Sequence, residues 1–380
     1  MPDNKNHHYV PRFYLRYFTS QEKCIDLFNV RTKKLIKKAP IKGQCCRDYF
    51  YGKNIENEKS LSAVEGQIAN TFRAIFERRR LPSSFTAGHL LLCFHIVTQA
   101  YRTQYAADTL DELTDGMWKE ILKHDPKVPK ENLKDVQIKY EDPALVALGH
   151  AMRAFPLLMD LEMGVLLAPR GSEFITSDNP IVMSNKFMNW RRLGSNTGIA
   201  SKGLQILFPI CPILTLVMYD KDVYHFGRSK SSAIEVASAQ DVHELNVLQM
   251  VSASKNVYLF SPAANVFKVA EHAMRFRRTK KGLVQVVAQT EDEKGKSELI
   301  QTSHEDIRTD ARLDFLRIHS QAKRWLGAFR SEKYQKAVVL RNDHYWERFQ
   351  AHENAIGAGD AKFEDMVSAI YGKAVQDGTF

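Results

Sequence analysis

The chain has 380 residues, 44% hydrophobic and 26% charged, a balance typical of a globular protein with one large core or two ordinary ones. It contains no run of about 18 uncharged apolar residues and no Cys-x-x-Cys spacing among its five cysteines, which argues against a membrane span and a structural zinc module and favours a cytoplasmic protein. A formal net charge of +10 makes nucleic acid or another polyanion the expected partner.

The first notable segment, residues 7–18, contains two histidines, two arginines and five aromatic residues. Histidine is the side chain best suited to binding a metal or carrying a proton near neutral pH, and arginine pairs well with phosphate. Adjacent side chains of an extended segment point to opposite faces, so His7 and His8 share a site only if the chain turns, and Pro11 would assist that turn. Alternation along an extended run would put Tyr9, Phe13 and Tyr17 on one side, where a core role is favoured over a role in stacking on bases.

The positive charge is concentrated near this segment. Residues 1–60 carry thirteen Lys or Arg against six acids. Part of this excess has a purely structural interpretation, because residues 24–38 alternate apolar and polar side chains and predict a small hairpin whose lysines are solvated.

Helices are predicted next. Ser62 and Glu65 have the spacing of a capping box, and apolar residues recur at helical intervals from there to about Arg80. Residues 86–123 predict further helix with a buried stretch, Leu90–Tyr101. We expect a charged surface loop over residues 125–143 and another helix over about 144–162.

From Gly164 the pattern changes to short strands, at residues 164–168, 174–177, 204–209 and 214–219. A helix near 239–253 and a strand over 256–260 follow, and then a basic helix over 264–281, a strand over 283–288, a charged linker over 291–298 and a largely helical remainder. This order predicts an α+β fold in which a helical N-terminal half packs on a mixed or antiparallel sheet and a helical extension follows. We expect a core domain over 1–262 and a C-terminal module over 263–380.

Three motifs stand in sequence order along the core domain. They are residues 7–15 (HHYVPRFYL), 101–103 (YRT) and 174–180 (FITSDNP). Together they resemble the pattern of the bacterial domain of unknown function 4238 family over about residues 5–261. The resemblance implies a set of site residues and no activity, and the last 120 or so residues lie beyond the usual domain.

The residue types of these motifs predict a phosphoryl-transfer site. His8 would be the general base, with His7 and Arg102 as further catalytic residues. Glu65 and Asp178 would hold a divalent cation, Mg²⁺ or Mn²⁺, while Arg12 contacts phosphate. The remaining expected substrate contacts are Asn179 and Asn246. The opening also resembles that of a ββα-metal nuclease, but no histidine follows Asn29 before His89, as such a site requires.

Each of these residues has a structural alternative. Glu65 has helix-capping spacing, and Asp178 and Asn179 form a good Asx turn before Pro180. Arg102 would pair with an acid such as Asp178 across the core. Asn246 has the context of a hydrogen-bonding residue inside a helix.

Three functions remain open. The leading hypothesis is a metal-assisted phosphodiesterase or nuclease acting on nucleic acid, as in a toxin or phage-defence effector. The alternatives are a nucleic-acid-binding protein without catalysis and a metal-free enzyme on a nucleotide or small anionic substrate. The signatures of P-loop, dinucleotide-binding, zinc-protease and serine-hydrolase proteins are absent from the sequence. The sequence leaves the oligomeric state open.

Overall fold

The computed structural model describes residues 5–191, 196–227, 234–277, 282–292, 295–304, 306–329 and 339–372. Helices and a set of mostly antiparallel strands are segregated along the chain, so the predicted α+β class is confirmed. No helix within these ranges is both long and apolar enough to cross a membrane.

The N-terminal segment folds as a strand followed by a helical turn. Strand β1 (Asn6–His8) pairs antiparallel with β4 (Cys46–Asp48). After Pro11 the chain enters α1 (Arg12–Leu15) and the 3-10 turn η1 (Arg16–Phe18), so the expected extended row of aromatics is wrong. The predicted hairpin is confirmed as β2 (Cys24–Asn29) and β3 (Lys34–Pro40), which leads into η2 (Ile41–Gly43).

Helices occupy most of the next hundred residues. Helix α2 (Ile55–Arg78) begins seven residues before Ser62, so the capping box expected from Ser62 and Glu65 is wrong, and both residues lie inside the helix. The apolar stretch is confirmed as the buried helix α3 (Ala87–Tyr101). The helical segments that follow are α4 (Gln104–Leu122), η3 (Lys130–Lys134), α5 (Pro143–Ala154) and η4 (Phe155–Leu158).

The central sheet has the strand order β11-β5-β9-β8-β7. Its strands are β5 (Glu162–Leu167), β7 (Val182–Ser184), β8 (Gln205–Cys211), β9 (Leu214–Tyr219) and β11 (Ile234–Val236). Only the β11–β5 pairing within this sheet is parallel, so the sheet is mixed. A second sheet, in the order β3-β2-β12-β6, joins the N-terminal hairpin to β6 (Thr176–Ser177) and β12 (Asn256–Leu259).

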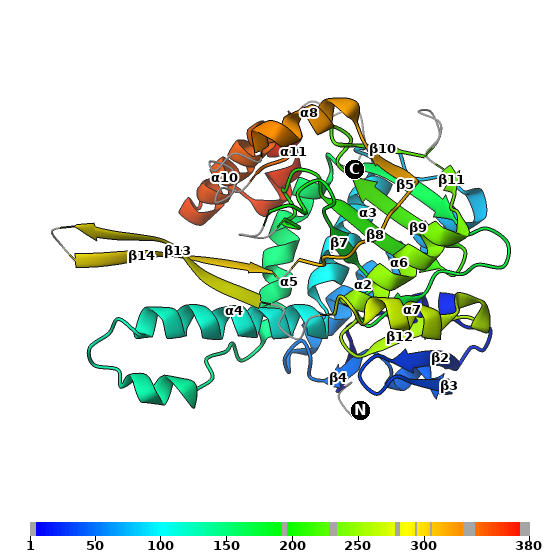
Figure 1. Cartoon of the computed structure of the whole chain (residues 1–380), viewed down its shortest axis with the longest axis horizontal. Coiled ribbons are helices and arrows are strands. Elements are labelled where there is room, and N and C mark those ends of the chain that lie inside the picture. Colours follow the sequence, from blue (N-terminus) through cyan, green and yellow to red (C-terminus); the bar gives the residue numbers. More distant parts are fainter. Residues whose placement is uncertain are drawn as a thin grey trace.

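Each face of the central sheet is buried by helices. Alternate residues of β8 point to different cores: Ile206 packs in the cluster that contains Leu92 and Ile96 of α3, and Leu207 packs in the cluster that contains Leu245. Leu245 belongs to α6 (Ala239–Ser252), which lies in front of the sheet in Figure 1. Because both faces are covered, the strands are almost wholly apolar.

The C-terminal residues form further elements around this core. They are η5 (Pro262–Ala264), α7 (Val266–Ala273), β13 (Gly282–Asp292), β14 (Gly295–His304), β15 (Leu316–Ile318), α8 (Ser320–Phe329), α10 (Asp343–Ala358), η6 (Phe363–Asp365) and α11 (Met366–Tyr371). The basic helix is shorter than expected, since α7 ends at Ala273, and residues 278–281 lie outside the described ranges. The charged linker expected over 291–298 is wrong, because β13 and β14 pair into a long hairpin that extends beside α4 (Figure 1).

These later elements share the hydrophobic cores of the earlier ones. Strand β15 pairs with β10 (Tyr224–Phe226), and Leu316 lies in the same cluster as Leu245 of α6. Ile370 of α11 lies in the cluster around α3. A module boundary at residue 262 stays a prediction, but side chains from both parts pack together.

Candidate functional site

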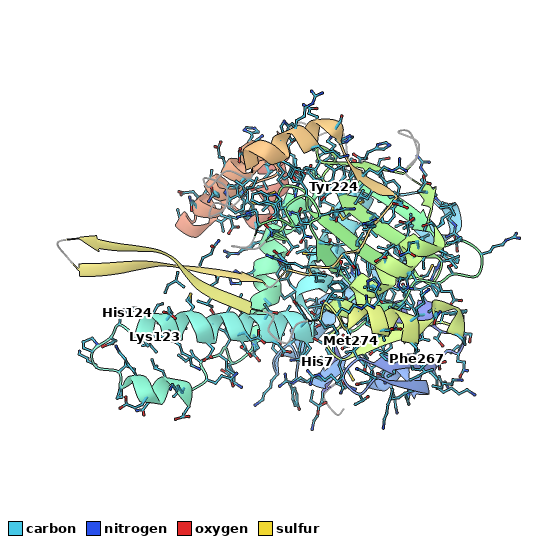
Figure 2. The ribbon with its side chains drawn as sticks, in the orientation of Figure 1. His7, Lys123, His124, Tyr224, Phe267 and Met274 are labelled. Carbon is cyan, nitrogen blue, oxygen red and sulfur yellow. The ribbon has the colours of Figure 1, made fainter. Side chains whose placement is uncertain are left out.

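The N-terminal motif borders a surface hollow of about 460 Å³. Its lining residues come from five elements and are called here the basic hollow: Asn6 and His8 of β1, Arg12 and Phe13 of α1, Arg16 of η1, Lys42 of η2, and Ser62 and Glu65 of α2. Figure 2 labels His7, the neighbour of His8 on β1, at the lower edge of the molecule.

Local folding explains why these residues meet. Pro11 holds an extended backbone at φ −60° and ψ 139° just before the helical turn, so the chain changes direction between His8 and Arg12. Arg12 and Arg16 are four residues apart in a helical segment, and Ser62 and Glu65 are three apart in α2, so each pair shares a face. The sequence therefore places two short polar faces opposite one another.

The hollow carries an excess of positive charge. Arg12, Arg16 and Lys42 are exposed, and none forms an ion pair with a carboxylate among the described side chains. The one acid among the described lining residues, Glu65, accepts a 2.7 Å hydrogen bond from Nη2 of Arg102. Because that pairing offsets the charge of Glu65, the three remaining cations set the electrostatic character of the hollow.

His8 lies among these cations as a neutral imidazole. Burial, followed by the nearby Arg12 guanidinium, lowers the pKa of His8 below its usual value of 6.5. Its Nε2 is covered from solvent and has no hydrogen-bond partner in the part of the chain that the structure describes. A neutral imidazole nitrogen of this kind can accept a proton at neutral pH once it is uncovered.

His7 does not line the hollow. It points to the other side of β1, is 2% exposed, and its Nδ1 accepts a 3.2 Å hydrogen bond from the Tyr51 backbone N–H. The imidazole also stacks on the Tyr51 ring, with 5.8 Å between ring centroids. The two histidines are thus separated by the strand alternation that the sequence predicted, and His7 has a packing role.

Arg102 does not line the hollow but binds one of its lining residues, Glu65. It follows the end of α3 and is buried, and its Nε donates to the Tyr9 carbonyl at 3.2 Å while Nη2 binds Glu65. Arg102 therefore pairs with an acid, as its structural alternative expected, but the acid is Glu65 and not Asp178. Arg102 thereby links the Glu65 side chain to the backbone of Tyr9, the residue that follows His8.

Asp178 lies away from the lining of the hollow, in the FITSDNP motif. Its carboxylate accepts three backbone N–H hydrogen bonds at 2.7–3.0 Å, from Ser254, Lys255 and Asn256. Burial raises the pKa of Asp178, although these hydrogen bonds favour the charged form. The carboxylate thus fixes the turn between α6 and β12, and within the described residues neither it nor Glu65 belongs to a group of three metal-capable side chains.

The two asparagines bridge backbone segments. Asn179 donates through Nδ2 to the carbonyl and hydroxyl of Ser252, at 3.1 and 2.8 Å. Asn246 accepts from the Ile175 N–H at 2.9 Å and donates to the Glu173 carbonyl at 2.8 Å. Both are buried and fasten the FITSDNP segment to α6, and neither lines the basic hollow.

Of the predicted site residues, the structure brings His8, Arg12 and Glu65 to one hollow, and the cations Arg16 and Lys42 beside them were not among the residues expected. Arg16 could have been found from its spacing to Arg12 once a helix was assigned after Pro11. Lys42 had no such signal, because it reaches the hollow only through the course of the β2–β3 hairpin.

Comparison with known proteins identifies a protein family for this chain but no individual similar protein. No curated protein matches the chain, and no solved structure matches it. One family model matches residues 6–262, which contain the basic hollow and the motifs at residues 101–103 and 174–180. The chain therefore belongs to the family described as Protein of unknown function (DUF4238).

Proposed function

We propose that the basic hollow binds a phosphate group of nucleic acid. The observation that carries this proposal is the convergence of Arg12, Arg16 and Lys42 on one hollow, where none of them pairs with a carboxylate of the side chains that the structure describes. Guanidinium groups present paired N–H donors that match phosphate oxygens, and a lysine adds a point charge. A phosphate that enters the hollow would supply negative charge to these three cations.

A polymeric ligand suits the site better than a small enclosed one. The three cations are exposed, so a phosphate can reach them while the rest of the nucleic acid stays outside the hollow. The wider surplus of basic residues in the first sixty would add sequence-independent attraction along the backbone. The same features support binding to DNA and to RNA.

A second candidate function is hydrolysis of the bound phosphodiester. It is favoured by His8, whose neutral imidazole lies in the same hollow and could take a proton from water that attacks phosphorus. Because Nε2 is covered in the free protein, the ring would have to turn towards the bound phosphate. The arginines would then stabilise the charge that develops on the phosphate oxygens.

The expected Mg²⁺ or Mn²⁺ ion at Glu65 and Asp178 stays a prediction. The contacts of both residues argue for a site without it, since Glu65 pairs with Arg102 and Asp178 accepts three backbone hydrogen bonds. Hydrolysis assays with and without EDTA distinguish a metal-dependent from a metal-free reaction.

Binding can be tested by charge-removing substitutions. We expect Arg12→Gln, Arg16→Gln and Lys42→Gln each to weaken binding of a fluorescent DNA or RNA oligonucleotide, measured by anisotropy, and to reduce the salt slope by about one unit per lost phosphate contact. Lys34→Gln is the matched control, because Lys34 is exposed on β3 and does not line the hollow. Equal weakening by the control variant would leave only nonspecific attraction and reject the hollow as the binding site.

Hydrolysis is tested on the same oligonucleotides. We expect His8→Gln to abolish cleavage and to change binding little, since glutamine keeps a polar side chain but cannot act as a base at neutral pH. Growth arrest on expression of the wild type, and not of His8→Gln, would support the toxin or defence role. If the wild type binds without cleaving under any metal condition, the protein is a binder and this second function is rejected.

A further inference from the structure

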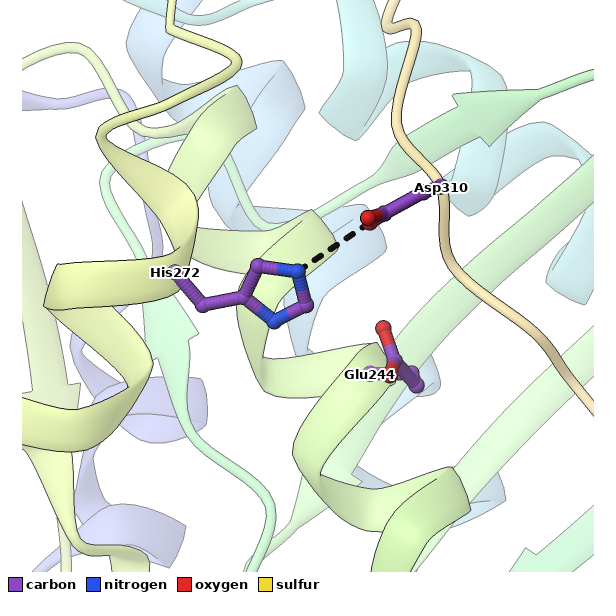
Figure 3. Close-up of side chains that lie close together, drawn as sticks. All are labelled: Glu244, His272 and Asp310. Carbon is purple, nitrogen blue, oxygen red and sulfur yellow. Dashed lines mark hydrogen bonds and ion pairs between the residues drawn. The ribbon is translucent and has the colours of Figure 1, made fainter.

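We propose that Glu244, His272 and Asp310 form a binding site for a divalent transition-metal ion. One potential ligand atom from each side chain lies within 4.8 Å of the others, close enough for all three to contact one ion. Figure 3 shows the imidazole and both carboxylates facing a common space. None of the three lines the basic hollow, so this site is separate from the proposed phosphate site.

The three ligands come from three different parts of the chain. Glu244 lies in α6, His272 lies in the last turn of α7, and Asp310 lies in the segment between β14 and β15. Packing of α7 on α6 brings the first two together. Asp310 reaches them because the following residues, Leu313 and Leu316, are anchored in the core that α6 covers.

Each ring nitrogen of His272 lies within hydrogen-bond distance of a neighbouring side chain. Nε2 of His272 lies 3.1 Å from Oδ1 of Asp310, and Nδ1 lies 3.2 Å from Nε2 of His243. The two imidazoles are nearly parallel, at 15°, with centroids 5.5 Å apart. With its proton on Nε2, His272 donates to Asp310. With its proton on Nδ1, it donates to His243 and Nε2 presents a lone pair, which is the tautomer that a metal requires, so a cation would take the place of the proton between Nε2 and Asp310.

The buried carboxylate supplies an independent indication of a cation. Glu244 is 6% exposed, and its Oε1 accepts from Nε2 of Gln240, while its Oε2 is covered and has no hydrogen-bond partner among the described residues. An uncompensated buried carboxylate oxygen is costly, so a bound cation would remove a penalty that the free protein retains. Asp310, in contrast, is 65% exposed at its side chain and leaves one side of the site open to water.

The donor set indicates the class of ion. One imidazole nitrogen and two carboxylates suit zinc and manganese, whereas calcium and magnesium sites are built from oxygen ligands alone. Three protein ligands leave coordination positions for water. His272 and Asp310 lie beyond the residues matched by the family model, and Glu244 lies within them, so the ion would fasten the C-terminal part of this chain to the family domain.

The test uses the full chain after treatment with EDTA and desalting. Titration with Zn²⁺ and, separately, with Mn²⁺ in a calorimeter should show uptake of one ion per chain by at least one of them. Glu244→Gln, His272→Gln and Asp310→Asn should each weaken that binding by about tenfold or more. His243→Phe keeps the stacked ring but removes the acceptor for His272, so a loss of roughly 10- to 100-fold is expected.

Two controls make the outcome decisive. His150→Gln removes an exposed histidine of α5 and should leave the titration unchanged. Asp310→Asn changes an exposed side chain and should keep the wild-type circular dichroism spectrum even if the buried variants unfold. The proposal is overturned if the wild type takes up neither ion, or if folded Asp310→Asn protein binds as tightly as the wild type.

Discussion

At the scale of single residues, strand and helix periodicity decide which polar groups face the hollow. His7 and His8 are chemically identical neighbours, yet one stacks on Tyr51 in the interior and the other lines the basic hollow. The same separation holds between Arg102, which is 3% exposed, and the exposed Arg12. Arg102 has its charge paired inside the protein, and Arg12 has its charge available to a ligand.

Asp178 gives a prediction that separates structural from catalytic roles. Asp178→Asn leaves one acceptor oxygen for three backbone N–H donors, and its new NH₂ group faces at least one of these donors. The free energy of unfolding should therefore fall by about 1–3 kcal/mol. Urea denaturation at pH 7 measures this loss, with the exposed Asp360→Asn as control. Unchanged stability combined with lost oligonucleotide binding would contradict the structural role and restore Asp178 to the site.

Sequence patterns of short range could be predicted, and contacts between distant residues could not. The β2–β3 hairpin and the buried helix α3 follow from local alternation and local apolar spacing. The pairing of Glu65 with Arg102 joins residues 37 positions apart, and the local spacing of Glu65 to Ser62 suggested a helix cap instead. The charged composition of residues 291–298 predicted a linker, but the described residues of this segment belong to the paired strands β13 and β14.

At the scale of elements, α3 combines an apolar surface with two buried histidines. Burial lowers the pKa of His89 to about 4, and burial followed by the nearby Arg102 lowers that of His95 to about 3. His95 packs against the rings of Phe72 and Phe208. Both imidazoles are therefore neutral in the folded protein at pH 7, where α3 shares one hydrophobic cluster with α2 and the central sheet.

This burial predicts a loss of stability in acid. The unfolded chain binds a proton at each histidine below pH 6.5, but the folded chain does not until about pH 4 or 3, so the unfolded state gains protons first. Each histidine should reduce the free energy of unfolding by about 3 kcal/mol between pH 6.5 and 4. Above about pH 7.5 neither histidine contributes to the pH dependence, because both are then neutral in the unfolded chain as well.

Comparison of variants isolates the histidine contribution. His95→Leu should reduce the loss of stability between pH 7 and 4, as measured by urea denaturation at each pH, because one proton-binding group is gone. His150→Gln, at an exposed position, should retain the wild-type pH dependence. An identical acid profile for His95→Leu and the wild type would contradict the assignment of His95 as a buried neutral group.

At the scale of the whole molecule, the C-terminal residues complete the family domain. Leu316 of β15 packs with the α6 side of the central sheet, and Ile370 of α11 packs with the α3 side. Phe315 packs against Phe226, with 6.0 Å between ring centroids. The two faces of one sheet are thus each covered in part by residues beyond 262, where the family match ends.

This sharing predicts that residues 1–262 do not fold stably alone, although that segment is the part matched by the family model. Removal of residues 263–380 would expose both cores, and even Ile370→Ala in the full chain should lower the free energy of unfolding by about 2–5 kcal/mol, because Ile370 is fully buried. Urea denaturation monitored by circular dichroism should show one cooperative unfolding transition for the full chain. The 1–262 fragment should show little or no cooperative transition. A fragment that melts as cooperatively as the full chain would instead establish a self-sufficient domain with a separable C-terminal module, as the sequence alone suggested.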